Sequence, residues 1–219
     1  RFNPSDMKNY ASSGKKIDVS NIFSLNRMGL GDSFEAGRSL TVGIDYRVEN
    51  LENINKYFDL KLATVFRDKE ENFIPKSTTI NKKNSNIYGQ ILNNFSENFK
   101  FDYNFSIAND LKSFQYNNIG TEFKINNLIT SFNYIKESGD IGTSSLLENT
   151  TKYNFNNQNL ITFSTRRNRE INLTEYYDLV YEYKNDCLIA GIKYKKSYYE
   201  DRDLKPSENL LFTVSFIPL

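Results

Sequence analysis

Histidine is absent from this 219-residue sequence, and cysteine occurs only once. Histidine is the usual general base of enzymes and the commonest metal ligand, so other side chains would have to take both roles. The single cysteine, Cys187, can build neither a zinc site nor a disulfide within the chain. An active centre would have to rest on carboxylates, lysine or serine alone. We therefore expect neither an enzyme nor a bound metal or cofactor.

Long hydrophobic runs are missing as well. No stretch of about 18 apolar residues occurs, so the sequence predicts no membrane-spanning helix. Charge of one sign is not in excess, because 28 basic residues stand against 27 acidic ones and the two are interspersed. A nucleic-acid-binding protein would normally show a basic stripe. The balanced charge argues against nucleic acid as a partner.

The residues that are present favour strands with one polar and one apolar face. The mean hydropathy is -0.61, yet aromatic residues reach 15% through 17 Phe and 15 Tyr. Disordered chains are poor in aromatic residues, so the low hydropathy does not indicate disorder. The chain begins at Arg1 rather than Met, and we expect it to be a piece of a longer polypeptide.

Apolar and polar residues alternate with a period of two along most of the chain. In residues 99–107, the clearest example, aromatic and aliphatic residues alternate with Lys, Asp, Asn and Ser. The sequence thus predicts an all-β, antiparallel up-and-down meander of about 11–12 long strands, part of a large transmembrane β-barrel. The strands are expected at residues 40–47, 58–63, 87–94, 99–107, 119–125, 128–136, 147–155, 160–167, 177–183, 188–194 and 210–216.

The links between these segments alternate in length. Short polar turns such as residues 126–127 and 184–186 alternate with longer links, of which residues 68–84 and 200–208 are clearly longer and charged. Outer-membrane barrels have short turns on the periplasmic side and longer loops outside the cell. If the last strand ends on the periplasmic side, every short turn falls on that side too.

A soluble β-sandwich is the alternative fold, because its strands also alternate around a shared apolar core. Sandwich strands usually have about five or six residues, whereas many of the segments here approach ten. The polar face also repeats Lys, Asp, Glu, Asn and Gly, as the wall of a water-filled lumen would. The pattern favours the membrane barrel over the sandwich.

Two stretches carry a family resemblance, and the first begins at Asn21 and reads NIFSLNRMGLGDSFEAGRSLTVGIDYR. It resembles the lipopolysaccharide-assembly family LptD (also called OstA or Imp), in which a loop containing NLFR, NRFSG and DR leads into a strand. Ser24 stands where the family usually has Arg, and Met28 where it has an aromatic residue. The positions taken as matching are Asn21, Phe23, Asn26, Arg27, Gly29 and Asp32.

The second stretch begins at Tyr181 and reads YEYKNDCLIAGIKYKKSYYEDRDLKPSENLLFTVSFIPL. It is similar to the end of the same family, where Tyr, a polar turn and Cys precede the penultimate strand. The resemblance predicts the C-terminal half of an LptD barrel, with residues 1–35 as an extracellular loop leading into it and residues 36–219 as barrel. The loop residues that match the alphaproteobacterial form are Asp201, Arg202, Asp203, Pro206 and Ser207.

The resemblance implies an outer-membrane lipopolysaccharide translocon of a Gram-negative bacterium. Its barrel would insert lipopolysaccharide into the outer leaflet through a lateral seam between its first and last strands. The implied partners are lipopolysaccharide, outer-membrane lipids, an LptE-like lipoprotein plug, the periplasmic Lpt bridge (reached through an N-terminal domain) and the barrel assembly machinery. A general outer-membrane porin, or another transport barrel, is the alternative function.

The resemblance also implies roles for single residues near the end of the chain. One lip of the seam would be Leu210, Phe212, Val214, Phe216 and Pro218. Pro218 cannot donate a ladder hydrogen bond, so it would shorten the pairing there; alternatively, it only terminates the strand. Cys187 would form a disulfide with the N-terminal domain outside this chain; alternatively, it is a small buried hydrophobe.

Other polar residues keep two interpretations each. Arg27 and Asp32 pair at the mouth of the lumen, or their loop is simply solvated. The cluster Arg166, Arg167 and Arg169 binds lipid phosphates, or it is ordinary surface charge. Glu70 and Glu71 form a loop charge run and not an acid/base pair. The charges expected to line a hydrated lumen are Asp45, Arg47, Asp102, Glu122, Lys124, Asp178, Glu182 and Lys193.

Overall fold

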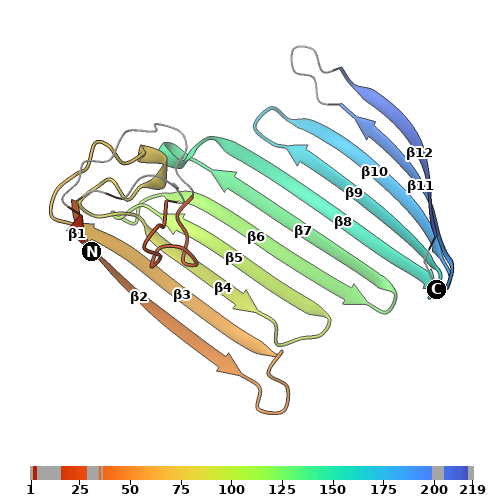
Figure 1. The fold of residues 1–219 in the computed structure, drawn as a ribbon, viewed down its shortest axis with the longest axis horizontal. Helices are drawn as coiled ribbons and strands as arrows, with labels where there is room; N and C mark the ends of the chain where they lie inside the picture. The colour runs from red at the N-terminus through yellow and green to blue at the C-terminus, as the bar shows by residue number, and fades with distance from the viewer. Residues whose placement is uncertain (1, 4–15, 29–34, 36, 199–204, 217–219) are drawn as a thin grey trace. The chain divides into compact units, whose positions relative to one another are not determined.

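The computed structural model describes residues 2–3, 16–28, 35, 37–198 and 205–216. Twelve strands follow one another in chain order in a single sheet (Figure 1). The strand pairs whose register is defined are all antiparallel. The predicted all-β antiparallel meander, part of a β-barrel, is therefore confirmed.

Most of the strands are long enough to cross a membrane. The exception at the beginning of the chain is β1 (Phe2–Asn3), a two-residue strand that pairs with the start of β2. Two single-turn 3-10 helices, η1 (Lys76–Thr78) and η2 (Gly139–Ile141), lie in the links. In the described part of the chain, no helix has the length and apolar character needed to span a membrane. The remaining strands are β2 (Gly37–Glu49), β3 (Tyr57–Arg67), β4 (Ile87–Asn93), β5 (Phe99–Ile107), β6 (Phe114–Ile125), β7 (Leu128–Glu137), β8 (Ser144–Asn156), β9 (Asn159–Asn168), β10 (Leu173–Lys184), β11 (Leu188–Ser197) and β12 (Ser207–Phe216).

The contacts divide the chain into two compact units. The first unit comprises residues 1–95, 101–119 and 136–143. The second unit comprises residues 96–100, 120–135 and 144–219.

In the first unit, the two faces of the sheet differ in chemistry. Register places Thr41 opposite Val65 and Asp45 opposite Lys61, so these residues share one face, called here the polar face. Leu40 and Ile44 lie on the other, apolar face and are 64% and 66% exposed, whereas Val65 is 0% exposed. A sandwich would bury the apolar face under a second sheet. The described residues form one sheet whose apolar face is open, so the sandwich interpretation is wrong.

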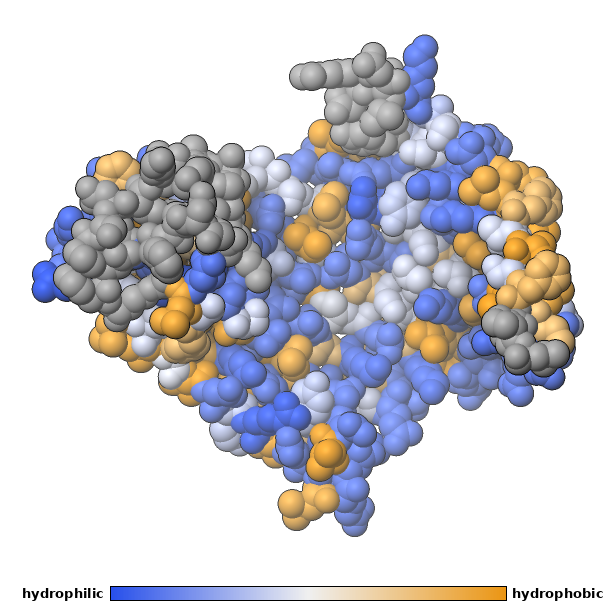
Figure 2. Space-filling view, in the orientation of Figure 1, coloured by the Kyte–Doolittle hydropathy of each residue, from blue (hydrophilic) through white to orange (hydrophobic). Residues whose placement is uncertain are grey.

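The second unit shows the same division. Register aligns Phe163, Leu179, Tyr194 and Leu210 across four consecutive strands, and Phe212 on this apolar face is 70% exposed. The neighbouring rows, which face the other way, contain Thr, Ser, Asp and Lys. The visible face of the strands in Figure 2 is mostly hydrophilic. Alternation of this kind is typical of strands with one face against lipid and one against water.

Aromatic side chains pack against one another on the apolar face. The rings of Tyr103 and Phe105 stack with centroids 5.1 Å apart. Phe105 also covers Gly89 on the neighbouring strand, where an added Cβ would lie 2.1 Å from the ring. A large ring over a glycine compensates for the side chain that glycine lacks in a strand.

The links alternate in length along the meander. Residues 50–56, 94–98, 126–127, 157–158 and 185–187 form the short turns, and the β3–β4 link, residues 68–86, is the longest described link. Asparagine side chains build the short turns: the Asn156 side chain accepts the N–H groups of Gln158 and Asn159, both at 2.9 Å. Asparagine favours turns because its side chain replaces a backbone acceptor.

Candidate functional site

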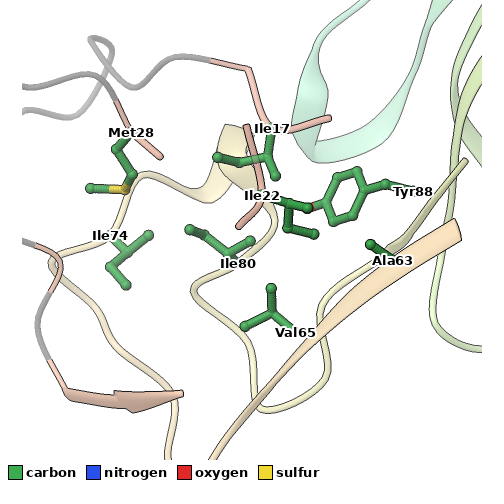
Figure 3. Packing of buried hydrophobic residues seen from close by; sticks show 8 residues of the cluster. All are labelled: Ile17, Ile22, Met28, Ala63, Val65, Ile74, Ile80 and Tyr88. Atoms are coloured by element: carbon green, nitrogen blue, oxygen red, sulfur yellow. The ribbon is translucent and has the colours of Figure 1, made fainter. Parts of the chain in front are cut away.

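A cap covers part of the polar face of the first unit. It consists of residues 16–28, which precede β2, and of the β3–β4 link (Figure 3). All buried apolar side chains among the described residues belong to this cap or to the strands beneath it. Ala63, Val65 and Tyr88 come from the polar face of β3 and β4, and the cap contributes Ile17, Ile22, Met28, Ile74 and Ile80.

Side-chain hydrogen bonds fold residues 16–28 into a compact turn. The Asp18 carboxylate accepts the N–H groups of Ser20 at 2.8 Å and Asn21 at 3.1 Å. The Asn21 side chain accepts the N–H of Asp18 at 3.1 Å and donates to the carbonyl of Lys16 at 2.7 Å. Asn21, which the sequence motif singled out, therefore closes the turn that places Ile22 against the sheet.

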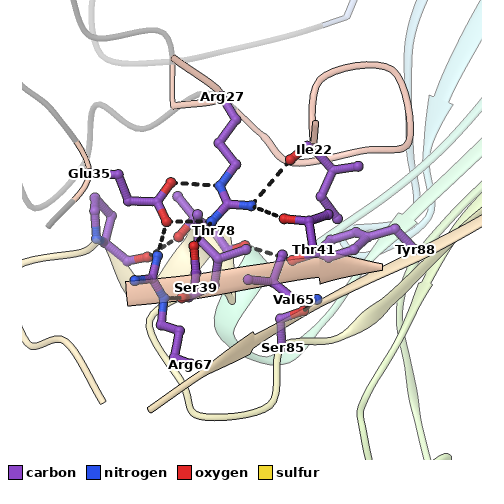
Figure 4. Close-up of polar contacts among 12 residues, drawn as sticks. Ile22, Arg27, Glu35, Ser39, Thr41, Val65, Arg67, Thr78, Ser85 and Tyr88 are labelled. Carbon is purple, nitrogen blue, oxygen red and sulfur yellow. Dashed lines mark hydrogen bonds and ion pairs between the residues drawn. The ribbon is translucent and has the colours of Figure 1, made fainter. Parts of the chain in front are cut away.

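Arg27 is the centre of a buried polar network (Figure 4). Its side chain is 1% exposed, and its Nε donates to Glu35 at 2.6 Å. The same guanidinium donates to the Thr41 hydroxyl at 2.9 Å, the Ser39 hydroxyl at 3.1 Å and the Ile22 carbonyl at 3.2 Å. The Arg27 side chain thus joins residues 16–28 to the beginning of β2.

Glu35 extends this network to the second part of the cap. It forms ion pairs with both Arg27 and Arg67, and Arg67 also donates to the carbonyl of Ile80 in the β3–β4 link. All three charged side chains are buried. Breaking a buried pair leaves an uncompensated charge, so such a network holds its elements in one arrangement. We call Arg27, Glu35 and Arg67 the latch.

Glu71 lies in the cap as well. It is buried, and an added Cβ at Gly37, whose φ is +78°, would lie 2.3 Å from its carboxylate. Glycine is required there because other residues rarely adopt a positive φ. Glu70 is exposed and Glu71 is buried, so the two adjacent carboxylates of this link have different surroundings.

Further contacts fasten the edges of the cap. Lys16 pairs with Glu137 at 2.6 Å and lies 3.1 Å from the centre of the Tyr116 ring. Burial lowers the pKa of Lys16 below its ordinary value, although the hydrogen bond to Glu137 opposes this. At the other edge, Lys82 pairs with Asp140 at 2.6 Å, so the β3–β4 link also contacts η2.

The remaining residues of the first motif have different positions. The Phe23 ring is 61% exposed and lies over Gly43, where an added Cβ would be 2.7 Å from the ring and 2.8 Å from the Leu62 carbonyl. Asn26 is an exposed turn residue. Gly29 and Asp32 lie outside the described residues. The partner seen for Arg27 is Glu35, which sequence reasoning missed because nothing distinguishes it from other loop carboxylates.

The charged residues that were predicted to line a lumen form ion pairs across neighbouring strands. In the first unit, Lys61 lies 3.6 Å from Asp45, and Arg47 lies 3.6 Å from Asp59. In the second unit, Lys193 lies 3.1 Å from Asp178 and Lys100 lies 3.0 Å from Glu122. Lys124 lines a polar cavity of about 330 Å³ near the short turns, together with Asn126, Asn127, Ile129, Asn154, Asn156 and Asn157.

The arginine cluster is engaged within its own unit. Arg166 pairs with Glu175 and lies 3.7 Å from Glu148. Arg167 donates to the Asn172 side chain at 2.5 Å, and Arg169 lies 5.8 Å from the centre of the Tyr134 ring. These contacts favour a structural role over binding of lipid phosphates.

The end of the chain supplies an edge strand and an exposed thiol. β12 pairs along its whole length with β11, and in the described part of the sheet β11 is its one neighbour. Cys187 is exposed and free, so the alternative of a buried hydrophobe is wrong. Pro218 lies outside the described residues. Leu210, Phe212, Val214 and Phe216 lie on the apolar face of β12 and are all exposed.

These features define the class of protein. Most strands have nine to thirteen residues, the apolar face is open, and paired charges occupy the polar face. This combination is typical of the wall of an outer-membrane β-barrel. Across the described residues, no cluster of His, Cys, Asp and Glu could hold a metal ion.

The comparisons with known proteins give the family. A family model described as "LptD: LPS transport system D" matches residues 3–172. The chain therefore belongs to the LptD family, a family of lipopolysaccharide transport and not of enzymes, and the predicted resemblance is confirmed. A porin variant from Rh. blastica is similar at a TM-score of 0.40 and 10% identity, covering 72% of this chain and 74% of the porin. No curated protein matches the chain.

Proposed function

We propose that this chain forms the C-terminal part of the barrel of a lipopolysaccharide translocon in the outer membrane of a Gram-negative bacterium. The single observation that supports it best is the inverted burial of the sheet: Ile44 is 66% exposed, while Val65 on the opposite face is 0% exposed. A barrel wall in a membrane has this inversion because its outer face is in contact with apolar lipid and not with water. Membership of the LptD family supplies the cargo.

The alternation of links supports an orientation. Short turns lie at the periplasmic end and the longer links at the extracellular end. Residues 1–35 then lead in from the extracellular side, and residues 36–219 belong to the barrel. The cap lies at the end with the longer links, where β2 begins and β3 ends, and it lies on the lumen face. The cap therefore narrows the lumen from the extracellular side.

The last strand serves as one lip of a lateral seam through which lipopolysaccharide reaches the outer leaflet. In its support, β12 has a single neighbour in the described sheet, and its apolar face is open. An unpaired edge in lipid leaves backbone groups unsatisfied, so such an edge needs a partner strand from the rest of the barrel.

The partners follow from the same assignment. They are lipopolysaccharide, outer-membrane lipids, the periplasmic Lpt bridge, the barrel assembly machinery and an LptE-like lipoprotein plug. The plug requires an accessible lumen wall. The polar face of the second unit supports this, since none of the buried apolar side chains among the described residues belongs to that unit.

Cys187 provides a covalent link to the N-terminal domain outside this chain. The thiol is exposed in a periplasmic turn, whose Asn185 side chain accepts the N–H of Cys187 at 3.0 Å. An oxidising compartment allows a disulfide there. Non-reducing electrophoresis of the full-length protein should show a mobility shift that Cys187→Ser removes; an unchanged pattern would reject the link.

Depletion of the full-length protein tests the function. Surface lipopolysaccharide should fall as the protein is depleted, measured by accessibility to an outer-leaflet modifying enzyme or a surface antibody. Re-expression of the wild type should restore it. If surface lipopolysaccharide stays normal while uptake of small solutes falls, the chain is a porin and the transport proposal is wrong.

A further inference from the structure

A polar cavity lies at the short-turn end of the second unit. Its volume of about 330 Å³ falls within the range of small-molecule sites, which is about 300–1,000 Å³. The residues that line it all belong to the second unit, and they comprise one lysine, five asparagines and one isoleucine. They are Lys124, Asn126, Asn127, Ile129, Asn154, Asn156 and Asn157.

The β6–β7 turn and the end of β8 build this cavity together. The Asn154 N–H donates to the carbonyl of Asn127 at 3.0 Å, which joins the two segments. A β-bulge interrupts the pairing of β8 with β9 between Asn154 and Asn156. Bulges re-aim side chains and are common next to functional sites. Both asparagines that flank this bulge line the cavity.

Turn geometry accounts for only some of these asparagines. The Asn156 side chain accepts two N–H groups of its own turn, and Asn126 has a φ of +50°, which asparagine tolerates well. The other three, Asn127, Asn154 and Asn157, make no side-chain hydrogen bond within the part of the chain that the structure describes. Three amide groups of the cavity therefore have unused donors and acceptors.

The charge of the cavity is not balanced. Lys124 is exposed, and its side chain has no ion pair with any described residue. Lys100 and Lys193 on the same face pair with Glu122 and Asp178, so an unpaired lysine is not a general property of this face. None of the residues that line the cavity is acidic.

A second unpaired ammonium group lies beside the cavity. Lys152 precedes Asn154 by two residues on β8, so both side chains are on the polar face. Lys152 is exposed and also has no ion pair among the described residues. Register places Leu160 between Asn154 and the carboxylate of Glu182. An anionic ligand would balance the two lysines.

The lining also indicates the rest of the ligand. Amide groups both donate and accept hydrogen bonds, which matches the hydroxyl groups of a sugar. An ammonium group pairs with a phosphate or a carboxylate. Ile129 is the single apolar residue of the lining, so the cavity does not suit an acyl chain.

We propose that this cavity binds an anionic saccharide, a sugar unit that carries a phosphate or carboxylate group. The proposal deepens the proposed function and rests on it for the source of the ligand, which is the glycan of lipopolysaccharide at the periplasmic end of the lumen. Lys124 pairs with the anionic group, and Asn127, Asn154 and Asn157 bind the hydroxyl groups.

Saturation-transfer NMR on the full-length protein in detergent micelles tests the proposal, with glucose 1-phosphate and glucose as probes and inorganic phosphate as competitor. Lys124→Gln removes the charge of the cavity and no contact within the described chain. Lys193→Gln is the matched control, because it removes the same charge from the same face on β11, outside the cavity. Asn127→Ala combined with Asn154→Ala tests the amide groups.

Glucose 1-phosphate should bind the wild type, and Lys124→Gln should raise its Kd about tenfold through the lost charge-assisted hydrogen bond. Lys193→Gln should change that Kd by less than about twofold, because salt screens a charge several strands away. The double asparagine variant should weaken binding of both glucose 1-phosphate and glucose. An unchanged Kd in Lys124→Gln would overturn the proposal. Inorganic phosphate that binds as tightly as glucose 1-phosphate would also overturn it, since the cavity would then bind any anion.

Competition with purified lipopolysaccharide distinguishes the two sources of an anionic saccharide. Displacement of glucose 1-phosphate by lipopolysaccharide would support the glycan of the cargo as the ligand. Lack of displacement would reject that source and assign the cavity to a free sugar phosphate. The depletion experiment tests transport separately, so a failure of the cavity would leave the proposed function standing.

Discussion

The polar faces of the two units are built from similar strands but have different surroundings. In the first unit, the cap buries Val65 and Tyr88 and encloses the latch. In the second unit, Lys193 and Asp178 pair on a face over which no buried apolar cluster lies, as far as the structure describes the chain. The same alternation thus supports a closed lumen wall in one unit and an open one in the other.

The difference shows where a charge can be tolerated on such a wall. On the open face, Lys193 and Asp178 are 37% and 17% exposed, so water reaches part of each group and a single ion pair is sufficient. Under the cap, water is excluded, so Arg27, Glu35 and Arg67 need several hydrogen bonds each. Single substitutions on the polar face should therefore lower stability strongly in the first unit and weakly in the second.

Replacing Arg27 should give the largest effect. Arg27→Ala removes the central member of the latch, and we expect the docking of the cap to lose about 3–5 kcal/mol, as for other broken buried pairs. Hydrogen exchange of residues 16–28 and 68–86 in the full-length protein measures this. Arg38→Ala is the control, because its pair with Asp68 at 2.6 Å is exposed and should contribute about 0–1 kcal/mol. Unchanged protection of the cap in Arg27→Ala would contradict the latch.

Truncating the apolar core of the cap should have the next largest effect. Ile80 is fully buried, and Ile80→Ala should lower the free energy of unfolding by about 2–5 kcal/mol. Leu211 lies on the polar face of the second unit and is 52% exposed, so Leu211→Ala should change it by less than about 0.5 kcal/mol. Urea titration in detergent micelles or vesicles checks both values. Equal losses would mean that the second polar face is covered as well.

The apolar faces should show no such difference between the units. Ile44→Arg in the first unit and Phe163→Arg in the second should each cost about 2–4 kcal/mol if both positions lie near the middle of the bilayer. Thr162→Arg places the same residue on the polar face and should change stability by less than about 1 kcal/mol. Folding titrations into lipid vesicles measure the three variants. A tolerated Phe163→Arg would remove the second unit from the lipid-facing wall.

The smallest effect is expected at the open ion pair. Lys193→Met should reduce stability by about 0–1 kcal/mol, because the Lys193 and Asp178 side chains are 37% and 17% exposed and water screens part of their attraction. The same urea titration is the measurement, with added salt as a control for screening. A loss above about 2 kcal/mol would show that this pair is buried in the membrane-inserted protein.

Much of the fold was predictable because a strand's alternation is a local property. The prediction for residues 99–107 matches β5 at both ends, and the long link predicted at residues 68–84 corresponds to the β3–β4 link at residues 68–86. β6 was predicted to begin at residue 119 but begins at Phe114, because Asn117 and Asn118 look like turn residues. In the structure, the Asn117 side chain accepts a hydrogen bond from the Tyr103 hydroxyl at 2.7 Å. A cross-strand partner keeps it within the sheet.

The cap was not predictable in the same way. Ile17, Ile22, Ile74 and Ile80 are isolated apolar residues in two links, and they show no period that would predict burial. The sequence motif drew attention to Asn21 and Arg27 but indicated neither the turn that Asn21 closes nor Glu35 as the partner of Arg27. Those contacts depend on segments that meet only after β2 and β3 have paired.

The sequence by itself therefore determined the two-faced strands, their order, the lack of histidine and the LptD motif. All of these depend on residue type and on spacing along the chain. Only the tertiary structure decided which links fold back onto the polar face, because burial of Val65 and Arg67 requires parts of the chain that are far apart in sequence. The position of a residue along a strand determines the face on which its side chain lies, and the rest of the fold determines which groups contact that side chain.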